Sequence, residues 1–141
     1  MADPKRYRLL NRSSDLAIKV FGNNQAELFA NSAFALFDLM AEMEHVEVRE
    51  HLALEVEGVD RDDLMVNWMR ELLHLFQGSG YLLKEFRIRE AKESYVRADV
   101  GGEKFDPDRH ELQREFRSVA YHQSRMEKTG DQWTAQVIFE L

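Results

Sequence analysis

Two acidic residues far apart in the sequence, Asp15 and Glu140, are positioned to act together. Asp15 directly precedes the alternating run "LAIKV", and Glu140 lies one residue before Leu141 in the last segment, "QWTAQVIFEL". Successive side chains of a β-strand point to opposite faces, so both acids are expected to point away from the core. In neighbouring antiparallel strands, the start of one lies beside the end of the other. Such a pairing would bring together Asp15, Glu140 and the terminal carboxylate of Leu141, whose side chain is expected in the core.

Three carboxylates in one place repel each other unless a positive charge lies among them. A hard divalent cation suits them, because calcium accepts carboxylates, carbonyls and waters in a flexible shell of about 6–8 oxygens. The pattern therefore predicts a divalent-metal site with Asp15, Glu140 and Leu141 as ligands and calcium as the expected ion. A second interpretation stays open, in which acidic residues at strand ends only protect a sheet edge.

Two segments have the 3.6-residue apolar spacing of amphipathic helices. In "NNQAELFANSAFALFDLMAEM", Asn24 and Glu27 form a cap pair at the start. In "DRDDLMVNWMRELLHLFQGSG", Asp60 caps the start and Gly78 is the expected end. Trp68 lies on the central apolar stripe of this second segment, so we expect a heavily buried helix.

The remaining apolar positions alternate with a period of two, which indicates β-strands. Strands are expected over Leu16–Val20, Val46–Val56, Tyr81–Arg89, Tyr95–Val100, Phe116–His122, Ser124–Lys128 and Trp133–Leu141. Glu50 breaks the alternation and predicts a bulge or an exposed strand end. The sequence "TGDQ" at Thr129–Gln132 predicts a hairpin turn. Strands interrupted by two separate helices indicate an α+β fold, a mostly antiparallel sheet with both main helices packed on one face.

Composition favours a protein or a cation as the binding partner. The chain has 141 residues, no cysteine and a formal net charge of −7. We expect a single domain over residues 1–141, a cytoplasmic location and no membrane association. Direct nucleic-acid binding is not expected, because it depends on basic residues that release phosphate counterions. Arg6, Arg8 and Arg12 could form a local basic spot, or simply the solvated face of a strand.

No motif for catalysis or nucleotide binding accompanies the acidic pair. The five histidines lack the spacing of known ligand motifs, and His110, after "DPDR", is expected in a turn. Ser13 and its neighbour lack a nucleophile motif, and "VGGEKF" lacks phosphate-loop spacing. We therefore expect that the protein is not an enzyme. A hydrolase using Asp15, Glu140 and His122 remains the least favoured interpretation.

Five segments, in this order, resemble the archease family: "FANSAFALFDLM", "DLMVNWMRELLHLF", "GGEKFDPDRHEL", "RSVAYH" and "VIFEL". The resemblance covers essentially the whole chain, with Gly102–Glu103 and Tyr121–His122 among its strongest pieces. It implies a strand-helix-strand-strand core elaborated into a larger α+β domain. It also implies a protein cofactor of the RNA ligase that joins 2′,3′-cyclic-phosphate and 5′-hydroxyl ends in tRNA splicing and RNA repair. In that role the protein promotes GTP-dependent guanylylation and multiple turnover of the ligase.

The resemblance implies the same metal ligands as the strand pattern, namely Asp15, Glu140 and Leu141. The family motif "DHTADIGI" stands here as "NRSSDLAI", so Asn11 replaces an aspartate. Asn11 and His122 are expected around the ligands. The loss of that acid, and an arginine beside it, predict weaker metal binding and a divergent, bacterial-type member of the family. A small-molecule-binding or protein-interaction module on a related fold, without ligase activation, remains the alternative.

Overall fold

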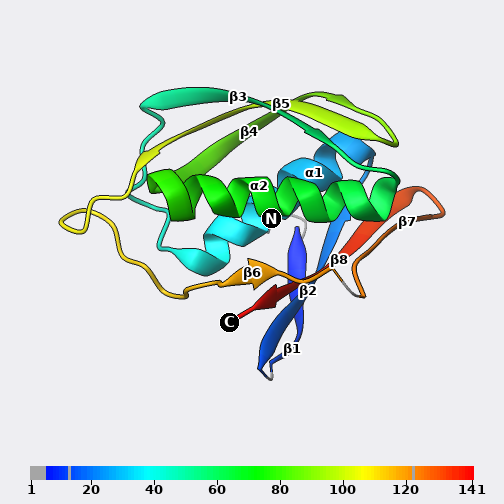
Figure 1. The fold of residues 1–141 in the computed structure, drawn as a ribbon, viewed down its shortest axis with the longest axis horizontal. Helices are drawn as coiled ribbons and strands as arrows, with labels where there is room; N and C mark the ends of the chain where they lie inside the picture. The colour runs from blue at the N-terminus through cyan, green and yellow to red at the C-terminus, as the bar shows by residue number, and fades with distance from the viewer. Residues whose placement is uncertain (1–5, 13, 122) are drawn as a thin grey trace, which may run out of the picture.

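The computed structural model describes residues 6–12, 14–121 and 123–141 (Figure 1). The strands and helices in chain order are β1 (Tyr7–Arg12), β2 (Asp15–Gly22), α1 (Gln25–Met40), β3 (Glu50–Glu57), α2 (Arg61–Ser79), β4 (Tyr81–Ala91), β5 (Tyr95–Lys104), β6 (Ser118–Val119), β7 (Arg125–Thr129) and β8 (Gln132–Glu140). Among the described residues, no helix is both long enough and apolar enough to cross a membrane.

The two helices lie between two antiparallel sheets (Figure 1). One sheet has the strand order β1-β2-β8-β6, with β7 also paired to β8, and the other has the order β3-β5-β4. The predicted α+β class and the antiparallel strands are confirmed, and each sheet has both helices on one face. The strands form two sheets, however, where a single sheet was expected.

The composition of α1 explains the second sheet. The buried residues of this helix are Leu28, Phe29, Ser32, Ala33, Ala35, Leu36, Phe37, Leu39 and Met40. They cover more than half of its circumference, which is wider than the apolar stripe of about 100° on a surface helix, so the helix must be covered on more than one side. The ring of Phe37 stacks on Phe86 of β4 at a centroid distance of 6.0 Å, while the buried side chains of β2 cover the opposite side.

Both helices begin at the predicted cap residues. The side chain of Asn24 accepts a hydrogen bond from the Glu27 amide at 2.8 Å, and that of Asp60 accepts one from the Asp63 amide at 2.8 Å. The expected end of the second helix at Gly78 is wrong. The helix ends at Ser79 and is capped by Gly80, which has φ 78°, a left-handed conformation that favours glycine.

The predicted hairpin at Thr129–Gln132 is confirmed, since β7 and β8 pair directly through these two residues. Glu50 is the exposed first residue of β3, one of the two outcomes expected for it. The strand predicted over Phe116–His122 shrinks to β6, and His122 lies outside the described residues. Backbone hydrogen bonds to β8 continue one residue beyond each end of β6, from the Arg117 amide to Glu140 at 2.7 Å and from the Ala120 amide to Ile138 at 2.8 Å. Phe116 stacks on Phe139 at 4.5 Å between ring centroids.

Trp68 lies at the centre of the core. Its side chain is fully buried, its indole N–H donates to the carbonyl of Phe29 at 3.0 Å, and its ring meets the edge of the Phe29 ring at 6.0 Å. One residue thereby ties α2 to α1 through packing and through a satisfied polar group.

We expect Trp68→Ala to lower the free energy of unfolding by about 3–5 kcal/mol, because it leaves a large cavity between α2 and α1. Denaturant melts would measure the loss. His74→Ala, on the exposed side of the same helix, is the matched control and should change stability by less than about 0.5 kcal/mol. A loss below about 1 kcal/mol for Trp68→Ala would contradict the central role of this side chain.

Candidate functional site

Asp15 and Glu140 lie directly opposite each other in the sheet. The antiparallel register of β2 and β8 pairs Asp15 with Glu140, Ala17 with Ile138 and Lys19 with Gln136. The start of β2 therefore lies beside the end of β8, as the alternation of the sequence predicted. Both acids are half-buried, and Leu16 and Phe139, the next pair along, point to the core.

Neighbouring backbone and a hydroxyl group fix the position of Glu140. Strand β6 pairs with β8 on the other side, opposite Glu140, and the Ser118 hydroxyl donates to the Glu140 carboxylate. The Arg117 amide donates to the carbonyl of Glu140 at 2.7 Å. Sequence reasoning did not single out Ser118, whose only signal was its place in the motif "RSVAYH".

The other predicted site residues have different outcomes. Leu141 follows the end of β8 and is 48% exposed, so the prediction that its side chain lies in the core is wrong. Alternation fails there because strand pairing ends at Glu140 and no layer of the core extends beyond it. Asn11 lies in β1 opposite Ala17, one strand away from the acidic pair. His122 is outside the described residues.

The donor chemistry of this sheet end fits a hard cation, although the protein supplies few ligands. Like charges directly opposite each other in a sheet are destabilising. Among the basic side chains that the structure describes, which do not include that of Arg12, none forms an ion pair with Asp15 or Glu140. The same residues contain no group of three or more His, Cys, Asp or Glu arranged for a metal. A cation held here would therefore need oxygens from the main chain, water or a partner.

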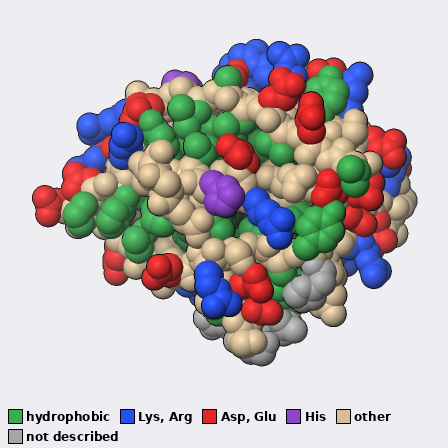
Figure 2. Space-filling model, in the orientation of Figure 1, with side chains coloured by type: hydrophobic (Ala, Val, Ile, Leu, Met, Phe, Trp, Pro, Cys, Tyr) green, Lys and Arg blue, Asp and Glu red, His purple; other side chains and the backbone are tan. Residues whose placement is uncertain are grey.

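A shallow cavity is lined in part by Ser118, the hydrogen-bond partner of Glu140. It has a volume of about 270 Å³ and lies between α2 and β6. Its lining residues are Arg70, Leu73, His74, Gln77, Arg117, Ser118 and Val119. Arg70 donates to the carbonyl of Val119 and Gln77 donates to that of Phe116, so α2 holds the segment that carries Ser118. Figure 2 views this side of the molecule and shows a histidine and a basic side chain near its middle.

A second residue of the motif "RSVAYH", Tyr121, also bonds to α2. The Tyr121 hydroxyl donates to the Asp63 carboxylate in the first turn of the helix. This hydrogen bond lowers the pKa of Asp63 and raises the pKa of Tyr121. Asp62, next to it, accepts from the Met126 amide of β7 at 2.7 Å. The acids at the start of α2 therefore bind the chain on both sides of residue 122.

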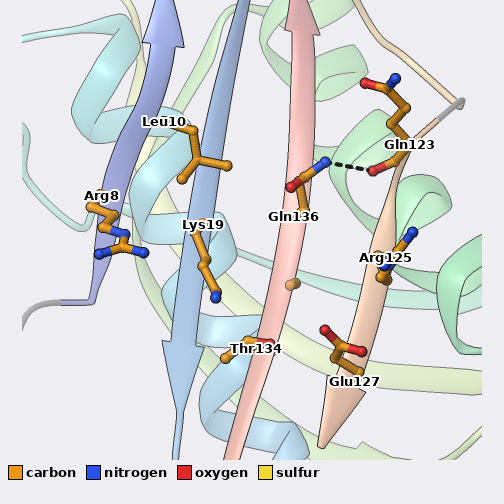
Figure 3. A pocket seen from close by; sticks show the side chains of 9 residues that line it. Arg8, Leu10, Lys19, Gln123, Arg125, Glu127, Thr134 and Gln136 are labelled. Carbon is orange, nitrogen blue, oxygen red and sulfur yellow. Dashed lines mark hydrogen bonds between the residues drawn. The ribbon is translucent and has the colours of Figure 1, made fainter. Parts of the chain in front are cut away.

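The face of the five-stranded sheet that points away from the helices, which we call the outer face, carries basic residues beyond the acidic pair. Arg8 pairs with Lys19, Lys19 with Gln136, and Gln136 with Arg125 across β1, β2, β8 and β7. Figure 3 shows these side chains on the side of the strands opposite α1. We call Arg8, Lys19 and Arg125 the basic row. Because Asp15 and Lys19 are four residues apart in one strand, both side chains lie on the outer face.

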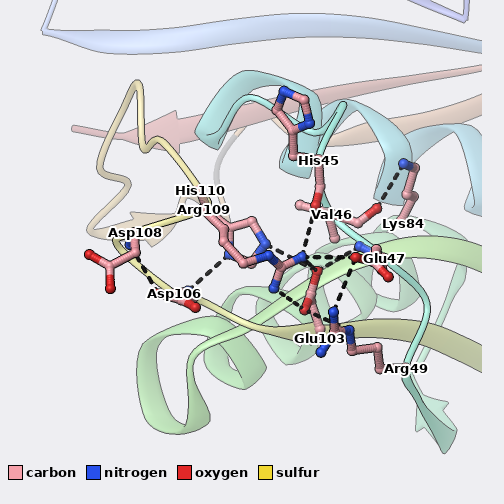
Figure 4. A network of polar contacts seen from close by, with 10 residues as sticks. All are labelled: His45, Val46, Glu47, Arg49, Lys84, Glu103, Asp106, Asp108, Arg109 and His110. Carbon is pink, nitrogen blue, oxygen red and sulfur yellow. Dashed lines mark hydrogen bonds and ion pairs between the residues drawn. The ribbon is translucent and has the colours of Figure 1, made fainter.

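A buried carboxylate, Glu103, organises the loops at the other end of the molecule (Figure 4). Arg109 donates to both of its oxygens at 2.8 Å, and the Glu47 amide donates to it at 2.6 Å. Gly102 before it allows close passage of the neighbouring strand, since a Cβ there would lie 2.0 Å from the carbonyl oxygen of Leu82. These bonds join the end of β5 to the segment before β3, so the motif "GGEKFDPDRHEL" has a structural role.

His110 completes this network. Its Nδ1 accepts from the Asp106 amide at 2.9 Å, so its proton lies on Nε2, which is 3.1 Å from a Glu103 oxygen. The side chain is fully buried, and the turn predicted around it is confirmed by the Asp106–His110 backbone hydrogen bond of 2.8 Å. Each polar atom of the ring has a partner, and none faces an open cavity.

The two helices between two antiparallel sheets define a class of small α+β proteins. The sequence model of the family described as "Archease protein family (MTH1598/TM1083)" matches residues 7–141, and the chain belongs to this family. A protein archease of Pyrococcus abyssi is 33% identical, with 97% of this chain and 99% of that protein covered. A protein archease of Methanosarcina acetivorans is 30% identical, with 97% of each covered.

Two solved structures have the same fold. Protein 1598 of Methanobacterium thermoautotrophicum superposes with a TM-score of 0.80 at 24% identity, covering 96% of this chain and 99% of that one. A Thermotoga maritima protein described as an archease and possible chaperone superposes with a TM-score of 0.61 at 14% identity, covering 100% of this chain and 98% of that one. The family expected from the five sequence segments is confirmed by the match over residues 7–141 and by the two archease relatives.

The Glu103 network predicts a specific loss of stability in acid. The hydrogen bonds from Arg109, chiefly, hold the pKa of Glu103 well below its usual range. The folded state therefore binds a proton less readily than the unfolded state. The stabilisation is complete above the ordinary glutamate pKa of about 4.3 and is lost as the pH falls below it.

We expect Glu103→Gln to lower the free energy of unfolding at neutral pH and to flatten its decline on acidification below about pH 4.3. Denaturant melts across that pH range would measure both effects. Glu111→Gln, an exposed substitution nearby, should follow the wild-type pH profile. Parallel pH profiles for Glu103→Gln and wild type would contradict the assignment.

Proposed function

We propose that this protein is a cytoplasmic accessory factor, and not itself an enzyme, that activates an RNA ligase. In this role it promotes the GTP-dependent guanylylation and multiple turnover of a ligase that joins 2′,3′-cyclic-phosphate and 5′-hydroxyl ends in tRNA splicing or RNA repair. A divalent cation, with calcium as the expected ion, is held by Asp15, Glu140 and main-chain oxygens of Leu141. The observation that carries the proposal is the Asp15–Glu140 pair in a chain of the archease family.

The chain's own residues have distinct roles in this proposal. Asp15 and Glu140 offer carboxylate oxygens from adjacent strands, so sheet pairing fixes their separation. Ser118 donates to Glu140 and orients that carboxylate before any ion binds. Bound there, a hard cation would neutralise the acidic pair and offer free coordination positions to an oxygen ligand of the partner.

Partner recognition, not catalysis, fits the surroundings of the acidic pair. The cavity that Ser118 helps to line, at about 270 Å³, is shallow, and other side chains of its lining already hold β6 in place. The described histidine that is fully buried, His110, has both ring nitrogens bonded within the Glu103 network, away from Asp15. The acidic pair itself is half-exposed at a sheet end, where another protein can reach it.

We expect Asp15→Asn and Glu140→Gln each to weaken calcium binding at least about tenfold, because each removes a negative oxygen ligand without changing shape. Ser118→Ala should weaken it about 10–100-fold by releasing Glu140. Calorimetry with calcium would measure these affinities. Asp131→Asn, in the exposed turn between β7 and β8, is the matched control and should bind calcium as the wild type does.

The stability of the same variants, measured with and without calcium, distinguishes a metal site from a pair of surface charges. When a chelator has removed calcium, the free energy of unfolding of Asp15→Asn should exceed that of the wild type by about 0.2–1 kcal/mol, because the substitution removes the repulsion between Asp15 and Glu140. Saturating calcium should reverse that order, since only the wild type gains the full binding energy. No calcium-dependent difference between the two proteins would refute the metal site.

For the ligase, we expect substoichiometric amounts of the wild-type protein to raise both the guanylylated fraction and the number of turnovers. Asp15→Asn should reduce this activation about tenfold or more at limiting calcium, because the affinity for the ion falls. A guanylylation assay with the RNA ligase of the same genome would measure it. The proposal fails if the wild-type protein leaves that ligase unchanged.

A further inference from the structure

The basic row is a local reversal of charge in an acidic protein. The chain has a formal net charge of −7, yet three basic residues and one acidic residue, Glu127, line a cavity of about 490 Å³ on the outer face. Within the described residues, no carboxylate forms an ion pair with Arg8, Lys19 or Arg125. These cations are therefore available to an external anion.

The side chains of the row are partly positioned in advance. The charged groups of Arg8 and Lys19 lie 5.8 and 5.9 Å from the centre of the Phe21 ring. Such contacts favour the cation over the ring face. On the far side, Gln136 donates to the carbonyl of Gln123 at 2.9 Å and holds the segment that leads into Arg125 (Figure 3).

The dimensions of the row indicate an extended ligand. Arg8 and Arg125 are separated by three strand spacings, about 14 Å, since neighbouring strands lie about 4.8 Å apart. Three cations spread over this distance can each meet a separate negative group. The row therefore suits a ligand that presents several negative groups across the sheet.

An acidic protein surface fits this face better than single-stranded RNA does. Proteins that bind single strands combine basic residues with open aromatic side chains on which bases stack. Here Phe21, the aromatic residue beside the row, already has Arg8 and Lys19 against its ring. Towards the acidic pair, the face continues with the paired residues Ala17 and Ile138, which form a small apolar cluster. Arginine beside apolar surface is typical of protein interfaces.

We propose that the basic row binds an acidic surface of the protein partner, and that the partner covers the outer face from the row to Asp15 and Glu140. The inference rests on the proposed function, because it takes the RNA ligase as that partner. The two ends of this face are about 13 Å apart, four residues along β2. One partner of ordinary interface size can reach both ends at once. The row then aligns the partner while the acidic end holds the shared cation.

The test uses the double variant Arg8→Glu, Arg125→Glu and the RNA ligase of the same genome. We expect the affinity for the ligase to fall at least about tenfold, mainly through slower association, and to depend less on salt than in the wild type. The matched control is Arg87→Glu, Lys104→Glu, which makes the same charge change at exposed residues of the three-stranded sheet. The control should bind the ligase at least about tenfold more tightly than the row variant.

Three measurements separate the outcomes. Calcium affinity of the row variant should equal that of the wild type, so that weaker ligase binding is not a loss of the metal. If the wild type binds the ligase and the row variant binds as the control does, the inference is overturned while the proposed function stands. If the wild type itself does not bind the ligase, both are overturned. Weaker binding of a single-stranded RNA 20-mer by the row variant, with ligase binding unchanged, would overturn the protein partner in favour of RNA.

Discussion

The register between β2 and β8 is the constraint on which the rest of the structure depends. Side chains alternate strictly along a strand, so a slip of one residue would exchange the inner and outer faces of both strands. The observed register buries Leu16 and Phe139 against the helices and, by the same geometry, places Asp15 opposite Glu140. The register that forms this part of the core therefore also brings the two acids of the site together. The energy that brings two like charges together comes from the apolar pairs beside them, because burial of large apolar side chains stabilises by about 1.5–3 kcal/mol each.

The remaining polar clusters hold the segments that this register does not reach. Glu103 joins the loop between β5 and β6 to the segment before β3, by accepting from Arg109 and from the Glu47 amide. At the opposite end, Asp63 accepts from Tyr121 and Asp62 from the Met126 amide, so α2 positions the chain on both sides of residue 122. Removing one partner of a buried charged pair costs more than the pair contributes, because the other group is left without compensation. The contacts of Glu103 and Tyr121 give the motifs "GGEKFDPDRHEL" and "RSVAYH" structural roles.

Much of the fold could be predicted from the sequence, because its strongest signals are local. Periodicity and caps gave α1, α2 and the β7–β8 hairpin, and alternation gave the outward direction of Glu140. The division into two sheets could not be predicted, because it follows from the cover that α1 needs on two sides and not from any strand taken alone. The prediction that the Leu141 side chain lies in the core was wrong for a related reason. Alternation predicts burial only as far as strand pairing extends. Ser118 and the basic row were missed because their members meet only through pairing between distant strands.

The outer face shows why net charge is a poor guide to where a protein binds. A formal charge of −7 argues against anionic ligands for the chain as a whole. At the surface of one sheet, however, interactions between charges are screened over about 8 Å in physiological salt. The acidic pair and Lys19 lie about 13 Å apart along β2, so each end acts on a ligand nearly independently of the other. A face with opposite charges at its two ends sets the direction in which a partner binds, because a partner with complementary charges gains attraction in one orientation and meets repulsion in the reverse one.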